Sequence, residues 1–460
     1  MRNIFIVVIT TIIAIASTDA QENLSLADAI QIGLERNYDI RIEKMNVTIA
    51  ENNNSWGEAG LFPNLTASLQ GGTSVFENKE ALNPFQILGQ TRTVQQFSPS
   101  INLNWNLLGI SNIFIAKHRL ETLQEETSGN ADVVIANNIQ AIILGYYIAV
   151  LEKKRTEEFQ KQLQLSRDKY HMVKLKTDLG SAVTTDLLLE EGNYLADSSS
   201  FISQELAYKN ALYNLSFLMG EPDSEKHYVL TDDLAYEEDI VVYEELLSKI
   251  NDSNIDLKKQ YLSQMLLRDD TQLNRAARLP QVSIGANYTY NTNIQDVTDW
   301  PLERREIRDR TTGQVIDVLD IGSNRNLNYG ANFTISYTLF SGGKINRAIQ
   351  RTIIQEDIGN IRMERLKASL SRDLKSTFEQ YKVRKQLYEI SNLRYNSTIK
   401  NLEISEEKFK SGTINSFDFR TVQNTHLSAS IQRLQALYSL MDSKVSLMRL
   451  TGGIIETYME

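Results

Sequence analysis

Few residues of this chain have the types and spacing that catalysis or metal binding requires. The chain has no cysteine, and its four histidines lack the spacing of a metal site: His118, His171, His227 and His426. Acidic pairs such as Glu190 and Glu191 occupy adjacent, diverging helix positions, which is typical of a solvated face. The sequence also has no glycine-rich phosphate loop and no nucleophile motif. It therefore argues against an enzyme and predicts no cofactor and no bound metal.

A different kind of chemistry is indicated by residues 101–108, INLNWNLL, where apolar side chains alternate with asparagine. Side chains of a strand point alternately to its two faces, so Asn102, Asn104 and Asn106 share one face and the apolar residues share the other. A soluble two-sided sheet fits this pattern. The wall of a membrane barrel, with water inside and lipid outside, fits it equally well.

Similar stretches occur elsewhere in the chain. The second half alternates in the same way at 282–291 and at 331–339, and another alternating stretch begins near residue 65. Polar loops separate the members of each pair, so the sequence predicts β-hairpins at 65–108 and 282–340. Each stretch is about ten residues long, the length with which a tilted strand crosses a bilayer.

The overall composition and the first residues limit the possible partners and location. The chain has 460 residues, a formal net charge of −10 and a pI near 5.2, so it has no basic field that would attract nucleic acid. Residues 1–20, MRNIFIVVITTIIAIASTDA, combine a basic start, an apolar run and small residues before a cleavage site, which predicts a signal peptide. A membrane anchor is the alternative, but the apolar run is shorter than the roughly 20 residues that a spanning helix needs.

Most of the remaining chain has helical composition. Residues 111–219 and 345–450 are rich in Leu, Ile, Ala, Glu, Lys and Gln, and each segment is interrupted once by a short loop that contains a glycine. All six prolines lie outside these segments. The sequence predicts two long helical hairpins. Their most apolar stretch, residues 141–151, is too short to span a membrane, so the chain would enter a membrane with strands.

The two halves of the chain are similar in sequence. NYDI at 37–40 matches NIDL at 254–257, and later anchors match with a larger offset. A tandem duplication with one insertion between Pro280 and Tyr329 accounts for the change in offset. We therefore predict three parts after the signal peptide: a first repeat at 21–220, an acidic connector at 221–245 and a second repeat at 246–460.

Taken together, the signal peptide, the duplication, the strand hairpins and the helical hairpins resemble the TolC-like outer membrane efflux proteins. The resemblance covers residues 24–453, and its most specific parts are LSLADAIQIGLERN at 24–37, FPNL at 62–65, LPQV at 279–282 and LFSGGKI at 339–345. It implies a fold that is mainly α with a small β part. Four strands from each of three chains would close a 12-stranded transmembrane barrel, and the helices would form a long periplasmic barrel.

The resemblance also implies a function. The expected protein is a homotrimer in the outer membrane of a Gram-negative bacterium that passively conducts substrates in efflux or type I secretion. Its expected partners are outer membrane lipid, a periplasmic adaptor (membrane fusion protein) and an inner-membrane pump of the RND or ABC type. The polar strand faces would line the barrel lumen with Asn102, Asn104, Asn106, Asn332 and Thr334. The adaptor would dock on small residues at the two helical turns: Leu179, Gly180, Ser181, Ser411, Gly412 and Thr413.

In this family the periplasmic turns close the pore, and aspartates follow each glycine. Asp186 and Asp418 occupy those positions here, and three copies of each would form an acidic ring that favours cations. The alternative is that each aspartate only caps the first turn of its helix. Thr421 replaces a second acidic residue of the family pattern, and Thr177 replaces an aromatic one.

Alternatives remain open for the function of the whole chain and for the role of the connector. Long helices would serve equally well in a periplasmic scaffold that conducts nothing, and only the strands favour a channel. The connector at 221–245 resembles the region that belts the helical barrel in this family, while a solvated linker is the simpler interpretation. The sequence does not identify the cargo, the pump or the gating stimulus.

Overall fold

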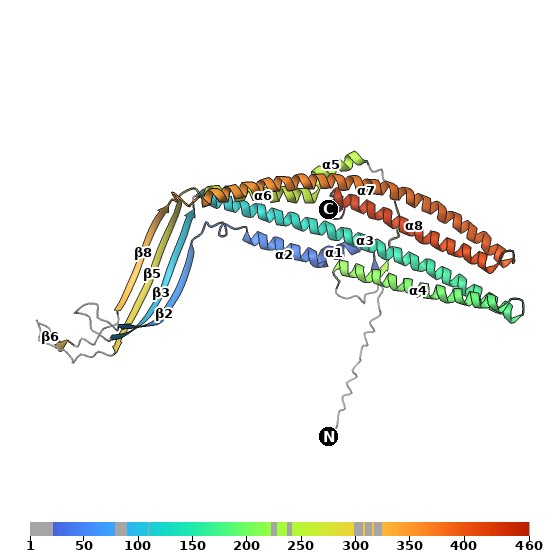
Figure 1. Cartoon of the computed structure of the whole chain (residues 1–460), viewed down its shortest axis with the longest axis horizontal. Helices are drawn as coiled ribbons and strands as arrows, with labels where there is room; N and C mark the ends of the chain where they lie inside the picture. The colour runs from blue at the N-terminus through green and yellow to red at the C-terminus, as the bar shows by residue number, and fades with distance from the viewer. Residues whose placement is uncertain are drawn as a thin grey trace, which may run out of the picture. The chain divides into compact units, whose positions relative to one another are not determined.

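The computed structural model of the chain describes residues 22–78, 90–108, 110–221, 228–236, 242–298, 307–308, 315–316 and 324–459. The chain divides into two compact units. Unit 1 consists of Met1–Ile49, Glu125–Leu262 and Asn360–Glu460, and unit 2 consists of Ala50–Gln124 and Ser263–Gly359. Unit 2 contains a four-stranded sheet, and unit 1 contains most of the helical residues (Figure 1).

The sheet of unit 2 is antiparallel, in the order β2 (Asn64–Asn78), β3 (Gln90–Leu108), β5 (Gln281–Thr298) and β8 (Asn324–Ser336). Both predicted hairpins are present, but β3 is 19 residues long and β5 is 18, well beyond the expected ten. The predicted strands were too short because β-pairing continues past the alternating stretches into polar segments. Conversely, β8 ends at Ser336 and not near residue 340, because its partner β5 begins directly after Pro280.

The inserted segment of the second half contains two short strands that the sequence did not predict. β6 (Ile307–Arg308) and β7 (Val315–Ile316) pair antiparallel with each other. The remainder of the expected loop between β5 and β8 lies outside the described residues, as does 79–89 between β2 and β3.

The register of the sheet separates polar from apolar side chains. Residues directly opposite each other in antiparallel strands share a face. One cross-strand row is Asn64, Asn104, Gly285 and Asn332. The adjacent row, on the opposite face, is Leu65, Leu103, Ala286 and Ala331. The two-faced sheet expected from the alternation is therefore confirmed.

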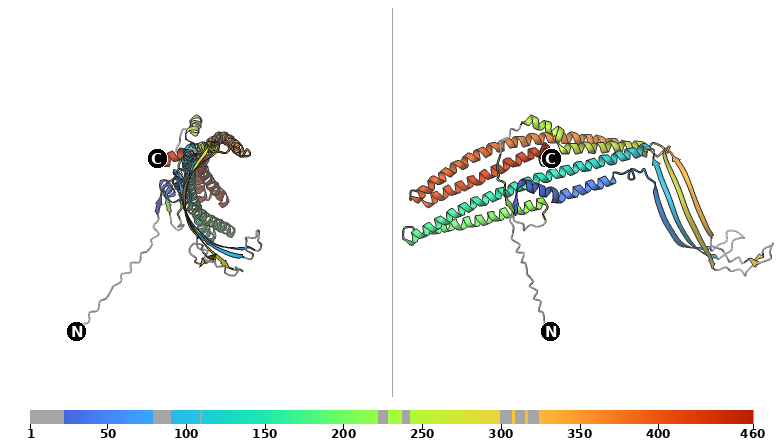
Figure 2. Two further views of the ribbon diagram at one scale, coloured as in Figure 1. Left: turned by 90° about the vertical axis from the view of Figure 1, so that its left-hand side faces the viewer. Right: turned by 180° about the vertical axis from the view of Figure 1, so that it is seen from behind.

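Unit 1 is a layer of long helices. Across the layer they follow the order α4 (Thr184–Met219), α3 (Ile110–Asp178), α8 (Ser416–Leu450) and α7 (Lys344–Lys410), as Figures 1 and 2 show. The first residues of α3 and α7, up to Gln124 and Gly359, belong to unit 2. The pairs α3–α4 and α7–α8 correspond to the helical hairpins expected at 111–219 and 345–450. The shorter helices of the chain are α1 (Leu26–Arg36), α2 (Tyr38–Asn53), α5 (Tyr243–Ser253), α6 (Ile255–Ala276) and α9 (Gly453–Met459).

The main core of unit 1 is formed largely by apolar side chains from α3, α4 and α8, and the short elements at both ends of the first half add Leu24, Ile30 and Leu230 among others. On α3 the buried residues recur every three or four positions, at Ile139, Ile142, Ile143 and Tyr146, and each is at most 2% exposed. They pack in one cluster with Leu215 and Met219 of α4 and with Leu437 and Val445 of α8. Burial of each such side chain stabilises the fold by about 1.5–3 kcal/mol.

Equivalent positions of the two halves make equivalent contacts. Asn37 donates from Nδ2 to the Leu218 carbonyl at 2.8 Å and accepts from the Ile40 amide. Asn254 does the same with the Leu450 carbonyl, also at 2.8 Å, and with the Leu257 amide. Each asparagine therefore joins a helix start to the end of a long helix, as a duplicated sequence predicts.

Part of the acidic connector packs against the helical core. β4 (Tyr228–Leu230) pairs in parallel with β1 (Glu22–Leu24), and Tyr228 and Leu230 are buried. The Tyr146 hydroxyl donates to the Leu24 carbonyl at 2.9 Å and accepts from the Asp232 amide. The solvated-linker interpretation is therefore wrong for Tyr228, Leu230 and Leu234, which are buried, while Thr231–Asp233 are exposed and residues 237–241 lie outside the described residues.

The sequence analysis also underestimated the apolar character of one helix. α3 is long and apolar enough over residues 112–178 to cross a membrane by length and composition, contrary to the expectation that no such segment follows the signal peptide. Half of its apolar window is buried inside the structure, where Ile139, Ile142 and Tyr146 belong to the main core. Packing within unit 1 accounts for the buried half of this apolar window.

Candidate functional site at the helical tips

The two helical hairpins of unit 1 end in turns of the same construction, at the same end of the helical layer (Figure 1). After α3 the chain reverses at Gly180, whose φ is 72°, and the Ser181 amide donates back to the Lys176 carbonyl. After α7 it reverses at Gly412, whose φ is 76°, and the Thr413 amide donates back to the Lys408 carbonyl. The left-handed backbone conformation at each turn explains why glycine stands there.

The predicted gate residues lie directly after these turns. Asp186 and Asp418 are both exposed and lie in the first turns of α4 and α8. The Asn415 side chain caps α8 by accepting from the Asp418 amide at 2.8 Å. In the described part of the chain neither aspartate carboxylate has a hydrogen-bond or ion-pair partner. Their position fits the favourable interaction of an acid with a helix N-terminus, and it also leaves both carboxylates available to solvent.

The residues predicted to contact an adaptor are all exposed at the two turns: Leu179, Gly180, Ser181, Ser411, Gly412 and Thr413. Leu179 of this set is 74% exposed, and the structure adds two further exposed apolar side chains beside the turns, Val183 at 60% and Phe417 at 71%. Sequence reasoning emphasised the small residues and missed Val183 and Phe417. Their signal was present in the sequence as apolar residues within otherwise polar turns.

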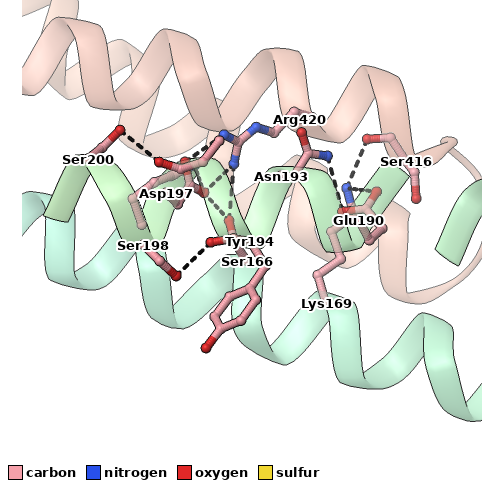
Figure 3. Close-up of polar contacts among 12 residues, drawn as sticks. Ser166, Lys169, Glu190, Asn193, Tyr194, Asp197, Ser198, Ser200, Ser416 and Arg420 are labelled. Carbon is pink, nitrogen blue, oxygen red and sulfur yellow. Dashed lines mark hydrogen bonds and ion pairs between the residues drawn. The ribbon is translucent and has the colours of Figure 1, made fainter. Parts of the chain in front are cut away.

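Behind the tips, an ionic network joins three helices. Arg420 of α8 forms two parallel hydrogen bonds with Asp197 of α4, with Nη1–Oδ2 and Nη2–Oδ1 distances of 2.6 and 2.7 Å (Figure 3). Arg420 also donates to Ser166 of α3 at 3.0 Å, and Ser166 donates to the same aspartate. The side chains of Arg420 and Asp197 are 17% and 9% exposed. This bidentate pair therefore lies in the packed interior.

A second buried pair lies closer to the turns. Lys169 Nζ of α3 is 3.0 Å from Glu190 Oε1 of α4 and donates to the Ser416 carbonyl of α8 at 2.9 Å (Figure 3). The two side chains are 3% and 1% exposed. The ammonium also lies 5.0 Å from the ring centre of Phe409 and 5.5 Å from that of Phe419. Burial lowers the pKa of Lys169, and the adjacent Glu190 carboxylate acts in the opposite direction.

The two pairs tie the start of α8 to the α3–α4 hairpin. Removing one partner of a buried ion pair costs about 3–5 kcal/mol because it leaves an uncompensated charge, whereas apolar replacement of both partners is often neutral. The contact between the hairpins at this level therefore depends on a few paired charges.

Sequence reasoning missed this network, and it was wrong about Glu190, which is buried and not part of a solvated face. Glu191 is half-buried, so the two neighbours do have different surroundings. The signal that was missed is the spacing of acidic residues along the helix. Glu190 and Asp197 lie seven residues apart and continue the stripe that carries Ala211, Leu215 and Met219.

The residues expected to line a lumen lie together on the sheet of unit 2. Asn102, Asn104 and Asn106 of β3 share one face with Asn332 and Thr334 of β8, which the register connects through β5. Asn102 donates to Ser100 at 3.1 Å, and Asn332 donates to Thr334 at 3.3 Å. Trp105 lies on the opposite face, and its indole donates to the Leu61 carbonyl at 2.9 Å. The indole therefore helps to hold the chain just before β2.

Comparison with known proteins agrees with this architecture. Residues 246–453 match the family model described as outer membrane efflux protein, which confirms the family resemblance seen in the sequence. No curated protein matches the chain significantly. The family is one of the outer membrane, in agreement with the location expected from the sequence.

Solved structures share the fold. The Campylobacter jejuni CmeC outer membrane channel is 15% identical with a TM-score of 0.70, covering 93% of this chain and 85% of that one. The open state of the Neisseria gonorrhoeae MtrE outer membrane channel is 14% identical with a TM-score of 0.68, covering 93% and 88%. The Vibrio cholerae outer membrane protein VceC is 11% identical with a TM-score of 0.66, covering 93% and 96%. The predicted fold, mainly α with a small β part and similar to TolC-like outer membrane channels, is thereby confirmed.

Proposed function

We propose that this protein is the outer membrane exit duct of a tripartite efflux or type I secretion system, conducting substrates passively and gated at its helical tips. The observation that carries the proposal is the four-stranded sheet with one polar and one apolar face. The family match and the similar channel structures support it. The proposed activity involves no catalysis.

The open edges of the sheet support assembly with further copies of the chain. β2 and β8 are the edge strands, and a sheet in lipid cannot leave its edge amides and carbonyls unpaired. Closure by symmetry removes these edges, so we propose that three copies form a 12-stranded barrel.

The outer helices of unit 1 support the same assembly. α4 and α7 border the helical layer, and both expose apolar residues that one chain leaves uncovered (Figures 1 and 2). On α4 they include Leu195, Ile202, Leu206 and Phe217, which are 58–66% exposed. On α7 they include Leu387, Ile390, Leu393 and Ile404, which are 53–70% exposed. Rows of exposed apolar side chains are typical of interaction surfaces, and α4 of one copy against α7 of the next would cover both.

The apolar face of the sheet fits outer membrane lipid. Along β5 this face runs from Val282 through Ile284, Ala286 and Tyr288 to Tyr290, and Arg325 lies beyond it on β8. That distance is about 27 Å along the strand, comparable with the roughly 25 Å apolar band of outer membrane barrels.

We place the gate at the tips in unit 1, with Asp186 and Asp418 at the constriction and the Arg420–Asp197 and Lys169–Glu190 pairs holding the hairpins together behind it. An adaptor and an inner-membrane pump would engage the exposed turns. Opening would then require the buried pairs to separate or to move as a unit.

A periplasmic scaffold that conducts nothing is the competing function, and two measurements separate the alternatives. The protein is extracted from membranes with and without detergent, and its oligomeric state is measured by light scattering. It is then reconstituted into planar bilayers. We expect a detergent-requiring trimer that conducts ions, whereas a soluble protein without conductance would overturn the proposal.

A further inference from the structure

The polar face of the sheet in unit 2 carries no charged side chain over a long paired stretch. On β2 from 64 to 72, β3 from 96 to 106, β5 from 281 to 293 and β8 from 324 to 336, every residue on this face is Asn, Gln, Ser, Thr or Gly.

This neutrality is a departure from the composition of the chain. Asp, Glu, Lys and Arg make up 23% of all residues, and a solvent-facing strand surface ordinarily includes some of them. Charged residues do occur in the strands, but Glu77 and Arg325 lie on the opposite face. The polar face is therefore selectively free of charge.

Several of the neutral side chains on this face form hydrogen bonds with one another. Ser98 donates to Asn291 at 2.7 Å, Ser68 and Ser100 share a hydrogen bond of 2.7 Å, and Asn102 donates to Ser100. Amides and hydroxyls in such pairs present dipoles to water and no fixed charge. A wall of this kind neither concentrates nor excludes ions of either sign, unlike a ring of carboxylates or ammonium groups.

We infer that the strand-built part of the duct is indifferent to the charge of its cargo and admits hydrated cationic, anionic and uncharged solutes alike. This inference rests on the proposed function, because it assigns the polar face to the lumen. Any preference of the whole duct for ions of one sign then arises outside this stretch.

The absence of cysteine from the chain allows a direct test. Asn104→Cys is introduced in the row of Asn64, Gly285 and Asn332, and the folded protein is reconstituted in planar bilayers. Methanethiosulfonate reagents then attach a negative, a positive or an uncharged group. Leu103→Cys, on the opposite face, is the matched control. Because charge is added only after assembly, a folding defect cannot imitate the result.

In about 0.01 M salt, where the Debye length is about 30 Å, we expect the negative and positive groups to change the K⁺/Cl⁻ permeability ratio at least about twofold in opposite directions and by similar factors. The uncharged group and Leu103→Cys should leave it unchanged. A markedly unequal response would overturn the inference, because it would reveal fixed charge already present in the wall. Conduction by wild type with no response at Asn104→Cys would overturn the assignment of this face to the lumen, whereas absence of conduction in wild type would overturn the proposed function itself.

Discussion

Two regions of unit 1 are built from the same three helices but hold them together differently. In the main core Ile142 and Tyr146 of α3 pack with Leu215 of α4 and Val445 of α8. Near the tips Ser166 of α3, Asp197 of α4 and Arg420 of α8 meet instead, with Lys169 and Glu190 as a second buried pair. The inward stripe of α4 thus changes from apolar to ionic along its length.

The two regions differ in how strongly their stability depends on the exact alignment of the helices. Apolar burial is non-directional and tolerates small shifts of the helices. It therefore stabilises the part of the layer that contains the main core, here called the trunk, in one assembled state. Buried ion pairs stabilise only while both partners are present and aligned, and an unpaired member is costly. Under the proposed function, a helical layer with an apolar core and ionic tips would keep the trunk closed while its tips respond to a partner.

The largest effect is expected at Arg420. Replacing it by Met leaves the Asp197 carboxylate buried without its partner, which should destabilise the tip region by about 3–5 kcal/mol. Thermal melting in detergent, followed by circular dichroism, should show an early transition that wild type lacks. Pairing Arg420→Met with Asp197→Leu should remove most of this loss. An equal loss in the single and double variants would show that packing, and not charge pairing, holds this region.

The apolar core should respond differently. Ile142→Ala creates a cavity and should cost about 2–5 kcal/mol. The loss should appear in the main melting transition, with tip-dependent conductance unchanged. An increase in conductance in this core variant would contradict the proposal that the core provides stability and the tips control conductance.

Acid should weaken the packing of α7 against α8 through His426. The Nδ1 atom of His426 and the Thr398 hydroxyl share a hydrogen bond of 3.3 Å, and the imidazole ring stacks on Tyr395. Burial lowers the pKa of His426, with Glu158 acting against this effect and Lys161 adding to it. The unfolded chain therefore binds this proton more readily, and stability should fall as the pH drops through 6.5 toward the lower folded-state pKa.

The measurement for His426 is the melting temperature between pH 7.5 and 5. Wild type should lose more stability over this range than His426→Gln does. His171→Gln, at an exposed position of α3, controls for the change of residue type. Parallel pH profiles for wild type and His426→Gln would contradict the prediction.

The smallest effect on stability is expected at the tip aspartates. Asp186→Asn with Asp418→Asn removes two helix-terminus interactions worth about 0.3–1 kcal/mol each. If the carboxylates also form the gate, the same variant should lose cation preference in reversal-potential measurements. A small loss of stability with unchanged ion preference would leave only the capping role.

Much of the fold followed from periodicity, while the ionic tip did not. Alternation around Asn104 predicted a two-faced sheet, and composition with glycine at 180 and 412 predicted the helical hairpins and their turns. The pairing of Arg420 with Asp197 could not be predicted, because the two residues are 223 positions apart and belong to different hairpins. The pairing of Glu190 with Lys169 lies within one predicted hairpin, but it depends on which residues of α3 and α4 face each other, which composition does not give. The β1–β4 pairing was missed for a similar reason, since each strand has only three residues and no pattern of its own.

The most direct test of this account is single-channel conductance in planar bilayers for wild type, Arg420→Met and Ile142→Ala. We predict low conductance for wild type and Ile142→Ala and a several-fold higher open conductance for Arg420→Met, because only the last variant removes the bidentate Arg420–Asp197 contact between α8 and the α3–α4 hairpin near the tip. Equal conductance in all three proteins would contradict the assignment of the gate to the ionic tip.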